Sequence, residues 1–301
     1  MTQRKTSQIP PEVAELEIRA GRKAERTFSQ FDPVREFQEL TDRPDVEIDL
    51  AEAALAIAAT EYPALSPAPW IRMIDHLADR VQAGPHLSIL ANIDAINQVL
   101  FKEEKFFGNT TDYDDPCNSF LNDVLERKTG IPITLSLVYT EIARRKGVPL
   151  VGVGFPGHFL VKHYGPPAEI MIDPFHRGRI LAISDCSALL KDHFGSEVEL
   201  KPEYFAAATK KQILARMLNN LKGSYYKRCN YPKVLTMIEL SLATREDVLT
   251  NVRDRGMVYF AMRRYSDAAR ELKAYLKLAE DEDTEVQEVL QMVGRIKGML
   301  N

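Results

Sequence analysis

The hydrophobic pattern of this 301-residue chain changes its period near residue 150, and this change restricts the fold more than any other feature. Before it, apolar residues recur at helical spacing up to Gly147-Val148-Pro149. After it, residues 150–155, 158–163 and 169–173 form short β-prone segments that Gly and Pro separate, which predicts strands. A helix followed by an antiparallel meander indicates an α+β domain.

The helix that begins at Pro132 is expected to be the most buried helix of the protein and to pack on this sheet. Proline suits the first position of a helix, and Gly147 with Pro149 ends it. Its apolar residues lie on more than one face, which is typical of a buried helix. They are Ile133, Leu135, Leu137, Val138, Ile142 and Ala143.

The region before this core predicts an all-helical block. Asp49 can cap a helix over residues 51–58, a second helix follows from Ser66, and a third covers residues 89–101. Another short helix is expected over residues 119–127.

Beyond residue 209 the chain is helical again and faintly periodic. Gly223 and Gly256 lie 33 residues apart, and Tyr231 and Tyr265 lie 34 apart. This spacing fits the 34-residue tetratricopeptide pattern, a pair of helices per repeat. We therefore predict a flexible tail over residues 1–30, a helical block plus core over 31–205, and a repeat-like helical tail over 206–301.

Composition restricts the class of function. The net charge of −4 provides no general basic character, so nucleic acid and anionic membranes are not expected as partners. No apolar run is long enough to span a membrane. Cys117, Cys186 and Cys229 are widely spaced and form no CxxC pair, so we expect reduced thiols, a cytoplasmic location, and neither a metal nor a cofactor.

One pair of residues suggests chemistry. If the strands over 158–163 and 169–173 pair with His158 directly opposite Asp173, the carboxylate fixes the imidazole tautomer. The other ring nitrogen can then act as a base. The alternative is a strand-end histidine and a turn aspartate that never meet, because the register is unknown. His163 and His176 could join His158 in a metal site, but their spacing is not diagnostic.

Several motifs occur in order along this region: Asn118-Ser119-Phe120-Leu121, Gly130-Ile131-Pro132-Ile133, Gly147-Val148-Pro149, Pro156-Gly157-His158-Phe159 and Ile172-Asp173-Pro174-Phe175. In this order they resemble the bacterial SirB-type proteins, which join a transglutaminase-like core to tetratricopeptide-like helices. The resemblance implies a papain/transglutaminase-like core with a small antiparallel sheet.

In transglutaminase-like folds a cysteine opens the buried helix, and His158 and Asp173 match the other two catalytic positions. The start of the helix here, Pro132 to Ser136, contains no thiol. Substitute nucleophiles are the hydroxyls of Thr134 and Ser136 or the thiol of Cys117. The competing interpretations are a capping or buried hydroxyl for the first two and a small loop residue for Cys117.

Two hypotheses for function follow. The missing thiol favours a degenerate module, a pseudoenzyme that binds a protein partner through its cleft or its helical tail, with Tyr226, Tyr259 and Arg263 as candidate anchors. The second hypothesis is a papain-like amidase, peptidase or acyltransferase that uses a displaced nucleophile with His158 and Asp173.

Overall fold

The computed structural model describes residues 32–165, 169–279 and 284–300. The chain divides into two compact units, Met1–Ile213 and Leu214–Asn301. The predicted flexible tail over residues 1–30 lies outside the described residues.

The first unit opens with the predicted helical block. Its helices are α2 (Pro33–Thr41), α3 (Leu50–Ala59), α4 (Pro67–Arg80) and α5 (Ile89–Asn97), and α5 continues into a π-helical turn over Gln98–Glu103. Asp49 caps α3 as predicted, because its carboxylate accepts a hydrogen bond from the Glu52 N–H.

Two further helices and a short parallel pair of strands follow. The helices are α6 (Leu121–Arg127) and α7 (Pro132–Arg145), and Pro132 occupies the first position of α7 as expected. The strands are β1 (Phe107–Gly108) and β2 (Thr129–Gly130). The sequence did not predict this pair, because segments of two residues show no hydrophobic period.

The main sheet is an antiparallel meander with the order β3-β4-β5-β6. Its strands are β3 (Leu150–Val153), β4 (Leu160–His163), β5 (Ile170–Asp173) and β6 (Arg179–Leu181). The first three match the predicted segments. The fourth was not predicted, because it is three residues long and only Leu181 is buried.

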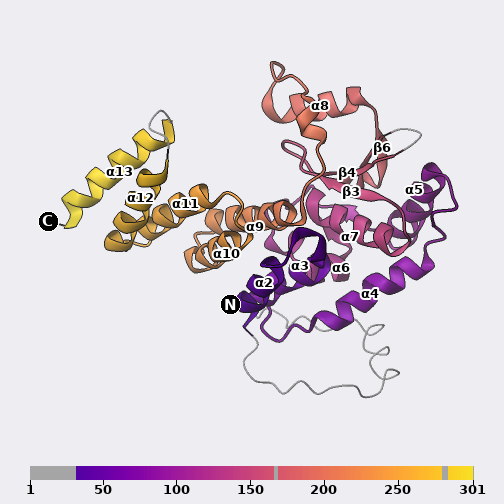
Figure 1. Ribbon diagram of the computed structural model, residues 1–301, viewed down its shortest axis with the longest axis horizontal. Coiled ribbons are helices and arrows are strands. Elements are labelled where there is room, and N and C mark those ends of the chain that lie inside the picture. Colours follow the sequence, from indigo (N-terminus) through magenta and orange to yellow (C-terminus); the bar gives the residue numbers. More distant parts are fainter. Residues whose placement is uncertain (1–31, 166–168, 280–283, 301) are drawn as a thin grey trace. The chain divides into compact units, whose positions relative to one another are not determined.

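Helices cover both faces of this sheet. Val153, Leu160, Met171 and Leu181 share one face and pack with Cys186 and Leu190 of α8 (Ile183–Phe194). Val161 and Ile172 are cross-strand partners on the other face and are fully buried. Figure 1 shows α8 and α7 on opposite sides of β3 and β4.

The expectation that α7 is the most buried helix is wrong. Eleven of its fourteen residues are buried, whereas nine of the ten residues of α3 are. Apart from Glu52, α3 consists only of Ala, Leu and Ile, so it has no polar stripe to turn toward solvent. The inference that α7 is a core helix is confirmed.

The second unit consists of antiparallel helices. They are α9 (Lys210–Lys227), which begins just before the unit boundary, α10 (Tyr231–Thr244), α11 (Val248–Ala261), α12 (Tyr265–Leu278) and α13 (Thr284–Leu300). Tyr231 and Tyr265 each open a helix, as the repeat predicts. A Cβ on Gly256 would lie 2.6 Å from the Leu272 side chain, so glycine permits the close packing of α11 on α12.

Leu137 tests the packing of α7. Its side chain is 2% exposed, so Leu137→Ala should lower the free energy of unfolding by about 2–5 kcal/mol through lost burial and a residual cavity. Leu90→Ala, at a leucine that is 56% exposed, is the matched control and should cost under about 0.5 kcal/mol. Urea denaturation measures both. A loss below about 1 kcal/mol at Leu137 would show that α7 is not a core helix.

Candidate functional site

A tight turn before β4 positions His158. The His158 N–H donates a hydrogen bond to the Phe155 carbonyl at 3.1 Å. Pro156 and Gly157 occupy the central positions, and the positive φ of Gly157, +70°, is the value that a type II turn requires at its third residue. A Cβ on Gly157 would also lie 2.5 Å from the His193 ring. The Pro-Gly pair therefore sets where the imidazole enters the site.

Asp173 ends β5 and caps the 3-10 turn Pro174–His176 that follows. Its Oδ1 accepts hydrogen bonds from the backbone N–H groups of Phe175 at 3.0 Å and His176 at 3.3 Å. The carboxylate is 1% exposed. The chain leaves the turn through Arg177, whose φ of 60° is left-handed.

His158 and Asp173 are in contact. The His158 Nε2 lies 3.0 Å from the Asp173 Oδ1, and the imidazole is 11% exposed. The predicted contact is confirmed, but the predicted register is wrong. Val161 pairs with Ile172, which shifts the strands by two residues and leaves His158 in the turn before β4. The imidazole therefore reaches the carboxylate from the turn and not from a directly opposite strand position.

His176 is the third member of the cluster. Its Nδ1 lies 2.7 Å from the Asp173 Oδ2, and its side chain is 53% exposed. The rings of His158 and His176 are stacked, with centroids 5.9 Å apart, and Phe175 meets both rings edge-on. His163, the last residue of β4, is not in this cluster. His176 follows Asp173 by three residues in the sequence, a spacing that does not by itself predict a contact. The 3-10 turn Pro174–His176 brings its imidazole back to the Asp173 carboxylate.

The histidines control the charge of Asp173. Burial alone would raise the pKa of this carboxyl, but hydrogen bonds from His158 and His176 and their positive charge when protonated hold the pKa below its ordinary value. Asp173 is therefore a buried carboxylate at neutral pH.

The two candidate hydroxyls of α7, those of Thr134 and Ser136, are both fully buried. Thr134 is fully buried; its Oγ1 lies 2.8 Å from the Asn118 carbonyl, to which it donates, and accepts a hydrogen bond from the Ile131 N–H at 3.1 Å. This is the capping role that competed with catalysis. Ser136 is also fully buried, and its Oγ has no hydrogen-bond partner.

Cys117 lies in a separate polar cluster. Its thiol hydrogen-bonds with Tyr62 and Asp123, and the Tyr62 hydroxyl donates to the Asp123 Oδ2 at 2.6 Å. Burial, together with the charges of Asp123 and Asp115, raises the pKa of the Cys117 thiol to about 12. The thiol is therefore protonated at neutral pH and is a weak nucleophile.

The other two cysteines differ in burial. Cys186 is fully buried on α8, and burial, with the charges of Asp185 and Asp173, raises the pKa of its thiol. Cys229 is exposed, and all three thiols are free. The cluster around Tyr62 and Asp123 was not predicted, because the sequence separates them by sixty-one residues.

Comparison with known proteins supports the architecture. Residues 68–219 match the transglutaminase-like superfamily, and residues 221–294 match the tetratricopeptide repeat. The chain is 32% identical over 239 residues to a UPF0162 protein of Xylella fastidiosa, which covers 78% of this chain and 85% of that protein. It is 38% identical over 181 residues to the human F-box only protein 21, which covers 56% of this chain and 28% of that protein.

Among solved structures, a crystal structure of menin aligns with 87% of this chain and 74% of its own, at 11% identity and a TM-score of 0.41. So weak a likeness carries no argument here. Among the described residues, no helix is long and apolar enough to cross a membrane.

Asp173→Asn tests the electrostatics of the cluster. The substitution should lower the free energy of unfolding at pH 7 by about 1–3 kcal/mol, since it weakens the hydrogen bonds of a buried acceptor. Because the folded pKa is lowered, this contribution is fully present above about pH 4 and is lost as the pH falls through the folded value. The difference between wild type and variant should therefore shrink between about pH 7 and about pH 3.

Denaturation at the two pH values measures this, with Asp192→Asn on the exposed surface of α8 as the control. A difference of the same size at both pH values would contradict the role assigned to the carboxylate.

Proposed function

Because this chain belongs to the UPF0162 proteins of the transglutaminase-like superfamily and joins that core to tetratricopeptide repeats, we propose that it is a catalytically degenerate module that binds a protein partner. Fold alone does not fix function, so the proposal rests on the site and on the repeats.

The observation that carries the proposal is that each of the three candidate nucleophiles, Cys117, Thr134 and Ser136, is buried or engaged with other residues in the part of the chain that the structure describes. Helix α7 begins with Pro132 and contains no cysteine. The Thr134 hydroxyl caps the helix, and Ser136 is fully buried. The Cys117 thiol is hydrogen-bonded with Tyr62 and Asp123. Covalent catalysis requires a nucleophile within hydrogen-bond reach of its base.

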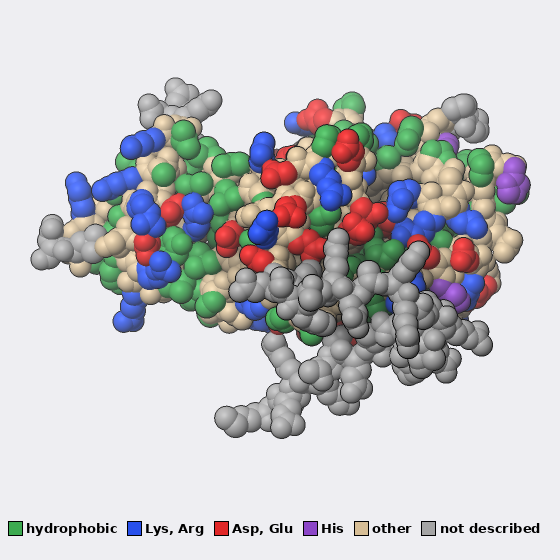
Figure 2. All heavy atoms as spheres, turned by 60° about the horizontal axis from the view of Figure 1, so that its bottom comes forward, with side chains coloured by type: hydrophobic (Ala, Val, Ile, Leu, Met, Phe, Trp, Pro, Cys, Tyr) green, Lys and Arg blue, Asp and Glu red, His purple; other side chains and the backbone are tan. Residues whose placement is uncertain are grey.

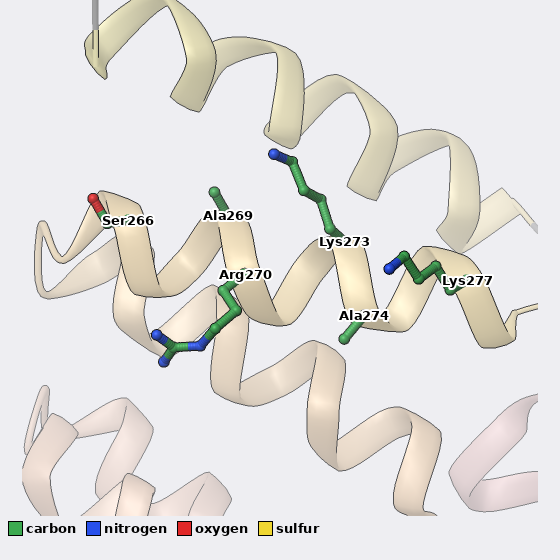
Figure 3. Close-up of a pocket in the computed structure, with 6 residues that line it drawn as sticks. All are labelled: Ser266, Ala269, Arg270, Lys273, Ala274 and Lys277. Atoms are coloured by element: carbon green, nitrogen blue, oxygen red, sulfur yellow. The ribbon is translucent and has the colours of Figure 1, made fainter.

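The repeats supply a surface for a partner. A pocket on α12 is lined by Ser266, Ala269, Arg270, Lys273, Ala274 and Lys277. Arg270 pairs with Asp267 at 2.9 Å, whereas no described residue forms an ion pair with Lys273 or Lys277. In Figure 3 Lys273 and Ser266 extend to one side of α12 and Arg270 to the other.

The charge of this surface suits an acidic segment of a partner protein. Figure 2 shows acidic and basic side chains interspersed over most of the face in view, with basic side chains more numerous over the C-terminal helices. Opposite charge speeds association and favours the matching partner.

The proposal also includes the type of family, the cellular location, the domain division and the classes of partner that are not expected. The motifs from Asn118 to Leu181 support a SirB-type protein, and three free cysteines support a cytoplasmic location. The division into residues 31–205 and 206–301, and the lack of nucleic-acid and membrane partners, are proposed on the same basis.

One observation favours a second candidate function, a papain-like amidase, peptidase or acyltransferase. The His158–Asp173 pair has the 3.0 Å contact that orients a general base. A nucleophile brought near His158 by a conformational change would complete that site.

Turnover distinguishes the two functions. The purified chain, assayed on amidase and transamidation substrates beside a transglutaminase of known activity, should give no rate above background. Removing a true nucleophile costs several orders of magnitude. Turnover that disappears in His158→Ala, or in any one of Cys117→Ala, Thr134→Ala and Ser136→Ala, would establish the enzyme instead.

Charge reversal tests the partner surface. A labelled oligoglutamate peptide should bind the full chain, and the double variant Lys273→Glu/Lys277→Glu should weaken binding at least about tenfold at low salt. The variant Lys102→Glu/Lys191→Glu makes the same change in charge at two exposed lysines elsewhere and should bind as wild type does. Fluorescence anisotropy measures both. Equal loss in the two variants would mean that only net charge matters.

A further inference from the structure

The cluster of His158, Asp173 and His176 has a property that hydrogen bonding alone does not require. Each residue offers one ligand atom, and these atoms all lie within 4.8 Å of one another. Among the described residues this is the group with the number, type and proximity of side chains to hold a metal ion. From this geometry we infer that the three residues bind a divalent transition-metal ion of the zinc class.

The distances between the imidazole nitrogens and the carboxylate oxygens would let one metal ion replace the two protons that link them. The carboxylate oxygens lie 3.0 Å from the His158 Nε2 and 2.7 Å from the His176 Nδ1. Two ligand atoms about 2.1 Å from one ion are about 3.0 Å apart at a right angle and about 3.4 Å apart at the tetrahedral angle. Only small movements are needed, and the half-exposed ring of His176 has room to make them.

The ligand types select the class of metal. Two imidazoles and one carboxylate suit zinc and iron(II), whereas calcium and magnesium prefer oxygen ligands alone. Three protein ligands leave at least one coordination position open.

The environment also favours a cation. Asp173 is buried, and its Oδ1 is oriented by the backbone N–H groups of Phe175 and His176. Hydrogen bonds that orient a metal-binding carboxylate raise the affinity of such sites. The sequence did not predict this site, because the spacing of 158, 173 and 176 matches no metal motif, and the fold alone brings them together.

This inference does not rest on the proposed binding function. The metal site lies in the core, whereas the proposed partner surface lies on α12. A metal on the His158 Nε2 would replace the hydrogen bond through which Asp173 orients the imidazole.

Zinc chloride titrated into the chelator-treated full chain tests the inference by calorimetry. Wild type should bind close to one ion per chain, and His176→Ala should bind at least about 100-fold more weakly, because loss of a direct ligand costs no less than loss of its hydrogen-bonded support. His76→Ala removes an exposed histidine from α4 and should bind as wild type does. Circular dichroism checks that both variants fold, and His176→Gln serves as a second variant.

Cobalt(II) reports the ligand type. Its complex should show visible absorption without a sulfur-to-metal charge-transfer band, since no cysteine is in the cluster. The inference is overturned if wild type binds no stoichiometric zinc, if the affinity of His176→Ala is unchanged, or if a charge-transfer band shows that a thiol holds the ion.

Discussion

The site depends on the hydrogen bonds that converge on the carboxylate of Asp173. Two imidazoles and two backbone N–H groups donate to oxygens that are almost completely buried. An isolated carboxylate in such a place would be strongly destabilising, and these donors offset that cost. The same contacts end β5, start the turn Pro174–His176, and hold His158 against the sheet. The same carboxylate therefore ends the strand, caps the turn and forms the site.

The parts of this arrangement that the sequence predicted are those with a strong period or a fixed chemistry. The helix over Pro132–Arg145 follows from its apolar pattern, and the helix pairs of the second unit follow from the recurrence of Tyr231 at Tyr265. The contact of His158 with Asp173 was predicted, although the predicted register was wrong and the turn before β4 makes the contact. Strands β1, β2 and β6 were too short to show any period. The contact of Cys117 with Asp123 and Tyr62, and the return of His176 to Asp173, depend on tertiary packing, which no local pattern encodes.

The core contains a histidine and the carboxylate that orients it, His158 and Asp173. The candidate nucleophiles Thr134 and Cys117 are instead engaged in other contacts. Thr134 serves the start of α7, and Cys117 serves a buried hydrogen-bond cluster with Tyr62 and Asp123. In the proposed degenerate core, His158 and Asp173 act with His176 as a set of metal ligands, while the repeats offer a basic surface on α12.

The central claim, that no thiol is activated by His158, is tested most directly by the alkylation rate of Cys117 as a function of pH. Mass spectrometry can follow iodoacetamide labelling in a Cys229→Ser background, which removes the exposed thiol. With a thiol pKa of about 12, the rate should be low at neutral pH, rise continuously with pH, and be unaffected by His158→Ala. A rate that reaches its plateau near neutral pH and loses it in His158→Ala would show a thiolate–imidazole pair and contradict the account.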